Sequence, residues 1–217
     1  MANPLTNKLT PERALIFRIT HISNIPWILD YGLPSKSSGL VDPNFISIGN
    51  ADSIVRRTSR TVPIPPGGAL SGYIPFYFTP YSPMMLNITT GYGGIIQRSN
   101  AEIAILVSSL YRIAELGVHS LFTDRHAYLE AANFYSDLKE LTKVDFASIQ
   151  TKDFKRDAND PSKGERYQAE ALIKDNVPVD ALIGIGCFAE AQERSISMEL
   201  RLRDMAIPVY ARPNWYF

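Results

Sequence analysis

Glu170 is a carboxylate at a point where the character of the chain changes. A polar, glycine-broken run at 150–164 precedes it, and an apolar stretch typical of a buried strand follows it. Such a residue is either a surface glutamate that opens a strand or a catalytic carboxylate held rigidly at the mouth of a cleft. Spacing alone favours the surface interpretation, so other parts of the chain have to decide.

Two further clusters could carry chemistry. Arg56 and Arg57 stand just before a stiff proline and glycine bend at 61–68. A pair of this kind is usually solvated, but a rigid bend is also a good mount for a guanidinium that binds an anion. Asp124, Arg125 and His126 form the second cluster, at the exit of a short strand. Asp124 could equally cap the next element there.

The histidines and the cysteine give weaker signals. Thr20 and His21 could either cap the next turn or line a pocket. The three histidines are too few and too dispersed for a metal site, so no metal is predicted. Cys187 is the only cysteine and stands in an apolar setting. It is interpreted as a buried apolar residue in a reducing, cytoplasmic setting.

Composition excludes several classes of protein. Lys plus Arg and Asp plus Glu both number 22 in 217 residues, so the net charge is zero and any nucleic-acid surface must be local. The sequence shows no hydrophobic signal segment and no apolar run of about 18 residues, so no membrane partner is predicted. Nucleotide-binding patterns of the Gly-x-Gly-x-x-Gly and P-loop kinds are absent.

The elements that must position these residues follow from hydrophobic periodicity and from turn residues. Pro75 lies inside an aromatic strand, which suggests a sheet edge or a bulge. Because strands and long helices do not alternate regularly, the fold is expected to be α+β with a mostly antiparallel sheet. Strands are predicted at 14–20, 73–78, 102–108, 120–123, 170–173 and 209–212, with a weak one at 45–48, and helices at 25–31, 51–57, 110–116, 127–141 and 188–203.

Five blocks of the sequence, taken in order, resemble the DarT family of bacterial toxins, which ADP-ribosylate single-stranded DNA. The block with Pro-Phe-Tyr-Phe-Thr-Pro, inside 73–84, is especially distinctive, and the resemblance covers about 14 to 217. The other four blocks are Ile19-Thr-His-Ile-Ser-Asn24, Val62-Pro-Ile-Pro-Pro-Gly-Gly68, Phe122-Thr-Asp-Arg-His126 and Arg166-Tyr-Gln-Ala-Glu170.

The resemblance implies a single ADP-ribosyltransferase domain over 1–217, PARP-like, with a split sheet and flanking helices. A flexible lead at 1–13 and a substrate-facing insertion at about 127–169 belong to this expectation. The implied activity is sequence-dependent transfer of ADP-ribose from NAD⁺ to thymidine in single-stranded DNA, which blocks replication in the bacterial cytoplasm. The implied partner is the macrodomain antitoxin DarG.

The resemblance also implies site residues. Glu170 and Arg57 fall on the catalytic positions, although Arg56 is only one residue away. Arg18 replaces the first of two family histidines, so a contact made by that imidazole would be lost. The implied NAD⁺-binding residues are Arg18, Ile19, Thr20, His21, Asn24, Ser35 and Arg57, and the implied DNA-binding residues are Tyr81, Met84, Arg125, His126 and Arg166.

The chemistry leaves the proton transfer open. A carboxylate can stabilise the positive charge that develops when the nicotinamide–ribose bond breaks. Thymine N3 must lose a proton, and either Glu170 assists this while Arg57 orients the substrates, or Arg57 accepts the proton as the family's usual proposal holds. The competing hypotheses are an ADP-ribosyltransferase that acts on RNA or protein, and a non-catalytic nucleic-acid-binding module of the same fold.

Overall fold

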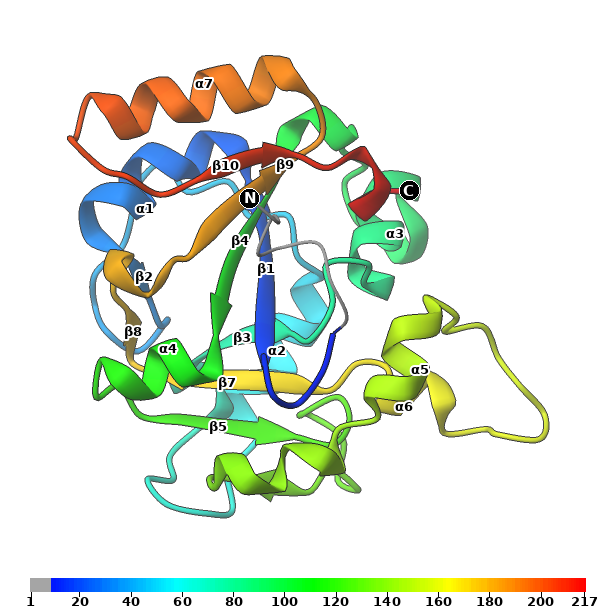
Figure 1. The fold of residues 1–217 in the computed structure, drawn as a ribbon. Helices are drawn as coiled ribbons and strands as arrows, with labels where there is room; N and C mark the ends of the chain where they lie inside the picture. The colour runs from blue at the N-terminus through cyan, green and yellow to red at the C-terminus, as the bar shows by residue number, and fades with distance from the viewer. Residues whose placement is uncertain (1–8) are drawn as a thin grey trace.

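The computed structural model describes residues 9–217 (Figure 1). The predicted flexible lead at 1–13 therefore lies mostly outside the described residues, and 11–13 form a turn that leads into the first strand. No helix in the described part of the chain is long and apolar enough to cross a membrane.

The described residues form one large sheet with the strand order β10-β9-β4-β1-β3-β7-β5-β6. Every pairing in it is antiparallel except that of β9 with β10, so the predicted sheet type is confirmed. A separate pair is formed by β2 (Leu33–Pro34) and β8 (Asn176–Val177). The large sheet consists of β1 (Leu15–His21), β3 (Tyr73–Tyr77), β4 (Ile103–Ser109), β5 (Ser120–Thr123), β6 (Phe134–Tyr135), β7 (Glu170–Lys174), β9 (Gly184–Cys187) and β10 (Val209–Ala211).

The sheet is split between β1 and β3. β1 pairs with β4 along its whole length, but it meets β3 at a single position, Phe17 opposite Tyr77. Beyond that point the Arg18 guanidinium donates to the Pro75 carbonyl at 2.8 Å, in place of a strand-to-strand bond. In Figure 1, β1 and β4 run across the direction of β3, β7 and β5. The two halves thus diverge and leave a gap between them.

Pro75 does not mark a sheet edge, because β3 lies between β1 and β7. The edge prediction is therefore wrong. Proline lacks the N–H that a central strand needs, which normally excludes it there. The side of Pro75 that faces β1 lies at the split, where the ladder has already ended, so the missing donor leaves no partner unsatisfied.

Helices pack around the sheet, and α1 and α7 lie together beside β9 and β10 in Figure 1. The core is built from apolar side chains of the strands, and β4 is buried over nearly its whole length. Cys187 is fully buried, as its apolar setting predicted, and Trp215 and Tyr216 dock against the sheet. The α-helices are α1 (Ile25–Tyr31), α2 (Ala51–Ser59), α3 (Pro83–Thr90), α4 (Leu110–Glu115), α5 (Phe146–Thr151), α6 (Lys163–Arg166) and α7 (Glu190–Arg201).

Three sequence predictions are wrong. The segment 127–141 is no helix, because its apolar residues pack from turns, β6 and a 3-10 helix at Leu138–Lys143. No strand forms at 45–48. Helical spacing over 188–203 also predicts Ile196, Met198 and Leu202 as core residues. Ile196 is buried, whereas Met198 and Leu202, the C-cap residue of α7, are exposed, because the face that packs carries Ile196 and Leu200.

Candidate active site

A cavity of about 220 Å³ opens at the split of the sheet. β1 and β3 form its walls, and the loop before α2 together with α2 itself closes one side. The sequence-predicted site residues that line it are Arg18, Ile19, Thr20, Ser35, Arg57, Met84, His126 and Glu170.

Glu170 is the first residue of β7 and only 1% exposed. Its Oε2 lies 2.7 Å from Nη1 of Arg57, and its Oε1 accepts from the Ala127 backbone N–H at 3.0 Å. Nδ1 of His126 approaches Oε1 at 2.8 Å, although its N–H is not aligned for a hydrogen bond. The structure thus brings three of the predicted residues into direct contact, with Arg57 rather than Arg56 on the carboxylate.

This surrounding keeps Glu170 ionised. Burial would raise the pKa of the carboxyl, but the positive charge of Arg57, the His126 imidazole and the Ala127 N–H outweigh burial and lower the pKa to about 2. The carboxylate is therefore a permanent negative charge at neutral pH. A fixed charge of this kind suits a site where positive charge develops during a reaction.

The arginines of the cavity carry unused hydrogen-bonding capacity. Arg18 has no ion pair among the described residues, and burial, followed by the charge of Arg57, lowers its pKa to about 10. Arg18 Nε and Arg57 Nη2 are buried and have no partner within 9–217. A buried cation with an unused donor is costly unless a ligand completes it. The donor set therefore fits an anionic ligand such as a diphosphate.

Two predicted NAD⁺-binding residues, His21 and Asn24, are not among the residues that line the cavity, and their side chains contact other residues of the chain. His21 Nδ1 accepts from the Ser23 N–H at 3.1 Å, and its Nε2 lies 3.6 Å from Glu102. Asn24 Nδ2 donates to the Thr20 hydroxyl at 3.1 Å, and its amide bonds both backbone groups of Ile46. Asn24 thereby ties β1 to the loop that forms the cavity wall, and it contacts two residues of the cavity lining, Thr20 and Ile46.

The remaining predicted DNA contacts lie outside the cavity lining. Arg166 is engaged with Asp145 at 3.0 Å and with Asp160 at 2.7 Å, and Arg125 contacts Asp124 and Glu165. The Tyr81 ring packs on Phe217, 3.9 Å between centroids.

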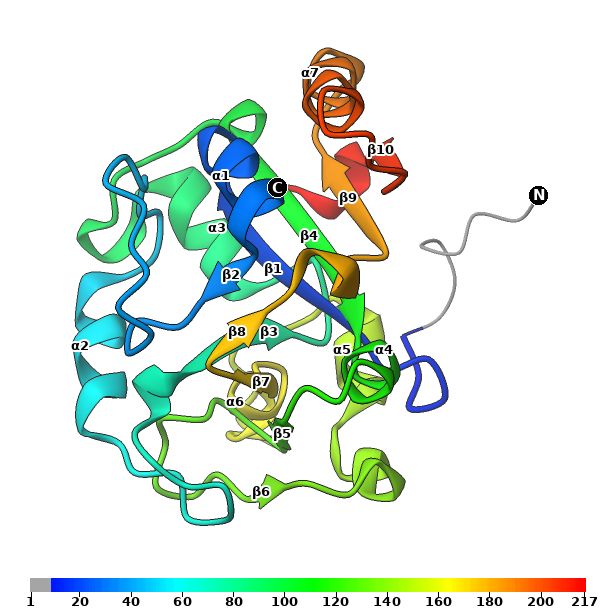
Figure 2. The same cartoon turned by 90° about the vertical axis from the view of Figure 1, so that its left-hand side faces the viewer.

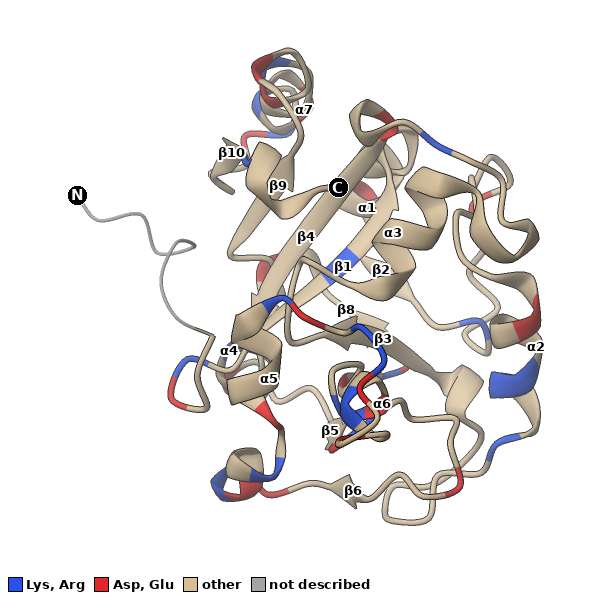
Figure 3. Ribbon diagram, turned by 90° about the vertical axis from the view of Figure 1, so that its right-hand side faces the viewer, with Lys and Arg blue, Asp and Glu red and all other residues tan. Residues whose placement is uncertain are grey.

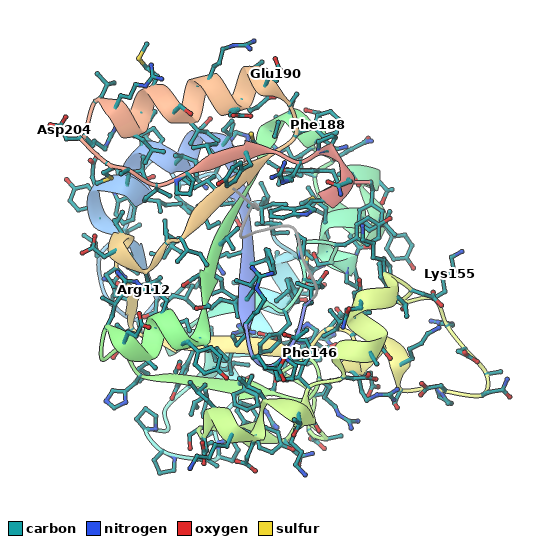
Figure 4. The ribbon with its side chains drawn as sticks, viewed as in Figure 1. Arg112, Phe146, Lys155, Phe188, Glu190 and Asp204 are labelled. Carbon is teal, nitrogen blue, oxygen red and sulfur yellow. The ribbon has the colours of Figure 1, made fainter. Side chains whose placement is uncertain are left out.

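Between α5 and α6 the chain forms a loop that projects from the body, with Lys155 on it (Figure 4). The Arg166 network ties the base of this loop to α5.

Sequence reasoning missed several lining residues. Tyr77 lies opposite Glu170 in the β3–β7 register, and burial, followed by the charge of Glu170, raises its pKa. Lys36 and Ser53 also face the cavity, from the loop after β2 and from α2. The alternation of the aromatic strand 73–78 could have found Tyr77, because Tyr73, Pro75 and Tyr77 share one side of it. No local signal marks Lys36 or Ser53.

The described residues contain no group of three or more His, Cys, Asp or Glu side chains that could hold a metal ion.

Comparison with known proteins gives consistent findings. A DNA ADP-ribosyl transferase of Escherichia coli O127:H6 is 46% identical over 217 residues, which is 100% of both chains. Among solved structures, Thermus sp. 2.9 DarT in complex with ADP-ribosylated ssDNA matches with a TM-score of 0.87 and 34% identity, over 95% of this chain and 98% of that one. The same protein in complex with NAD⁺ matches with a TM-score of 0.80 and 31% identity, over 95% and 99%.

These findings agree with the five sequence blocks and with the split sheet. Residues 17–217 match the family described as ssDNA thymidine ADP-ribosyltransferase, DarT. The match covers nearly all of the described chain, including the whole cavity lining. The protein belongs to the DarT family.

Proposed function

We propose that this protein transfers ADP-ribose from NAD⁺ to a thymine base of single-stranded DNA in a sequence-dependent way, with Glu170 and Arg57 as catalytic residues. The observation that carries the proposal is the contact of Glu170 with Arg57 and His126 inside the cavity of the split sheet. The relatives that carry the name DNA ADP-ribosyl transferase, and the Thermus structures with NAD⁺ and with modified DNA, support it.

The residues of the cavity fit NAD⁺. Arg18 and Arg57 carry the buried donors that its two phosphates need. Ile19 and Thr20 line the β1 wall and Ser35 lines the opposite rim. Bound NAD⁺ supplies the ADP-ribosyl group and nicotinamide as the leaving group.

Glu170 acts by its charge. With a pKa of about 2 it stays ionised, so it stabilises positive charge that develops on the ribose without any change of protonation. Arg57 holds one carboxylate oxygen in place at 2.7 Å, and its Nη2 is buried and has no partner among the described residues. Neither group is a good proton acceptor, since Glu170 is strongly acidic and a guanidinium stays protonated.

His126 is therefore the group we assign to accept the thymine N3 proton. Its Nδ1 faces Glu170, which leaves Nε2 at the opposite edge of the ring. A negative charge beside Nδ1 favours a proton there and a free lone pair on Nε2. We expect His126→Gln to slow transfer about 10²-fold or more. A His126→Gln variant that keeps the wild-type rate would return the role to Arg57 or Glu170.

The decisive experiment is mass spectrometry of short single-stranded oligonucleotides after incubation with NAD⁺. Each oligonucleotide would differ in one thymine position, and Glu170→Gln would run in parallel. We expect a mass gain of one ADP-ribose that depends on a particular thymine and is lost in Glu170→Gln. If no DNA gains mass while an RNA or a protein does, the RNA or protein alternative holds. If NAD⁺ stays intact with every substrate, the non-catalytic alternative holds.

The biological setting follows from this activity. We propose that the protein is a toxin of the bacterial cytoplasm whose damage to replicating DNA is reversed by a macrodomain antitoxin of the DarG kind. Co-expression tests this proposal. A macrodomain hydrolase should remove the ADP-ribose from isolated DNA and restore growth, and a hydrolase-dead variant of the macrodomain should not.

A further inference from the structure

α2 carries Arg56 and Arg57, and Arg60 follows it as the C-cap residue, but only one of these three arginines has a carboxylate partner. Arg57 contacts Glu170, whereas neither Arg56 nor Arg60 makes an ion pair with any described residue. Asp52 stands one helical turn before Arg56 but does not pair with it in the described structure. In a chain of zero net charge, Arg56 and Arg60 are two cations without a carboxylate partner next to Arg57 of the candidate active site, and they can attract an anion locally. Figure 3 shows both red and blue segments on α2.

Arg56 and Arg57 point in different directions because neighbouring helical residues do not share a face. Arg57 reaches into the cavity to Glu170. Arg56 lies over the ring of Tyr128, 5.8 Å from its centroid. The Arg60 guanidinium donates to the Leu129 carbonyl at 3.0 Å and so braces α2 against the same turn.

Tyr128 lies next to the cavity-lining residue His126. The two rings meet edge to face, with 4.3 Å between centroids and 70° between planes. Tyr128 is half-buried, packs partly on the small apolar cluster that contains Val62 and Ala127, and does not line the cavity.

The turn that carries Tyr128 is fixed. The Asp124 carboxylate accepts from the Asn133 backbone N–H at 3.1 Å and from its side-chain amide at 2.8 Å. An aromatic ring is thus held in place next to the candidate reacting centre, and a guanidinium without a carboxylate partner lies over it. Proteins bind single-stranded nucleic acids through such groups, because bases stack on the ring and phosphates contact the cation.

We propose that Tyr128 and Arg56 form a subsite for the nucleotide next to the target thymine. The neighbouring base stacks on the layer formed by the Tyr128 ring and the Arg56 guanidinium, and Arg56 takes the phosphate between the two nucleotides. This inference rests on the proposed function, because it assumes that single-stranded DNA enters at His126. It adds a contact outside the catalytic groups that would contribute to sequence preference.

The first test is DNA binding, which does not depend on catalysis. Fluorescence anisotropy of a labelled single-stranded oligonucleotide would be measured over a salt series for Tyr128→Ala, Tyr128→Phe and Arg56→Gln. We expect Tyr128→Ala to weaken binding about tenfold, Tyr128→Phe to bind like the wild type, and Arg56→Gln to lower the salt slope by about 0.7. Unchanged affinity and slope in all three would overturn the proposal.

The second test locates the contact on the DNA. Oligonucleotides that the wild type modifies would carry one abasic position on either side of the target thymine. Loss of the contacted base should slow modification by the wild type about tenfold and have little effect on Tyr128→Ala, because the ring it stacks on is already gone. Equal slowing in both proteins would overturn the proposal.

Matched controls separate this subsite from general effects and from the proposed function itself. Tyr31 is an exposed aromatic residue on α1, 54% exposed, and Arg194 is an exposed arginine on α7. Tyr31→Ala and Arg194→Gln should leave DNA binding unchanged. NAD⁺ affinity, measured by calorimetry, should be equal in all variants. A wild type that binds DNA through Tyr128 but modifies none would refute the proposed function and leave the subsite standing.

Discussion

The two residues that we propose as catalytic lie on elements that differ strongly in burial. Glu170 belongs to β7, which is paired on both sides, by β3 and β5, and whose first four residues are buried. Arg57 belongs to α2, a helix of nine residues without a single buried one, at the outside of the molecule (Figure 2). The Glu170 carboxylate is thus part of the core, whereas the arginine that contacts it is on a helix without a buried residue.

The largest effect should come from removing the contact between Arg57 on α2 and Glu170 on β7. We expect Arg57→Gln to lower the rate of ADP-ribose transfer about 10²- to 10³-fold, because a charged donor beside Glu170 is lost. Arg57→Lys should fall in between, since an ammonium keeps the charge but not the planar fork. Oligonucleotide mass spectrometry measures the rate, and circular dichroism checks the fold. Activity above a tenth of wild type in Arg57→Gln would contradict this assignment.

The stability that ionised Glu170 contributes on the buried strand β7 should depend on pH. The folded pKa of Glu170, about 2, lies below its ordinary 4.5, so the contact stabilises the fold above about pH 4.5 and is lost as pH falls toward 2. The full contribution is about 3 kcal/mol by linkage. Urea unfolding of wild type and Glu170→Gln between pH 6 and pH 3 measures the difference in stability, which should shrink as the pH falls. A constant difference would show that Glu170 carries no such shift.

The helix α2 can be destabilised without changing a residue that lines the cavity. Val55 on α2 is 67% exposed, so its side chain contributes little packing. Val55→Gly should lower the local stability of α2 by several tenths of a kcal/mol, and Val55→Ala should raise it by a similar amount. Amide hydrogen exchange should change in α2 and not in β7, and saturating NAD⁺ should slow exchange in α2. Equal protection of α2 and β7 in the wild type would remove the contrast.

The smallest effect concerns the link between β5 and β7. The buried Thr123 hydroxyl accepts from the Glu170 N–H at 3.1 Å and donates to the Arg125 carbonyl at 2.6 Å. It thereby fixes the start of β7 relative to the turn that carries His126. Thr123→Val should cost about 1 kcal/mol of stability and lower kcat a few-fold with KM for NAD⁺ unchanged. Thr123→Ser should restore both, and failure to do so would indicate a packing effect instead.

The sequence predicts best where local and tertiary preferences agree. β1, α1, β4 and β7 carry their own periodicity and end signals, and all four form close to the predicted residues. The segment 127–141 has helical spacing, but the Asp124 carboxylate binds the backbone and side chain of Asn133, and the turn that this contact closes overrides the pattern.

Site residues, like secondary structure, are hard to predict from the sequence where their position depends on tertiary structure. The change from loop to apolar strand marks Glu170 as a candidate, but spacing alone favours a surface glutamate, and the family resemblance is what places it on a catalytic position. The role of Arg18 could not be predicted, because it depends on where two strands separate. Its guanidinium lies in the cavity only because the β1–β3 ladder ends after Phe17 and Tyr77. His21 and Asn24 belong to the same sequence block, yet the backbone at the end of β1 uses their side chains as caps and ties.

Pro75 limits how far the hydrogen-bond ladder between β1 and β3 can extend. Its carbonyl faces β1, so its nitrogen faces β1 as well, and a residue with an N–H there could extend the ladder by one more step toward Ile19. Each such step would draw the two halves of the sheet together and shut the space that the ligand needs. A proline in the middle of the sheet thereby keeps the β1–β3 ladder from extending across the cavity.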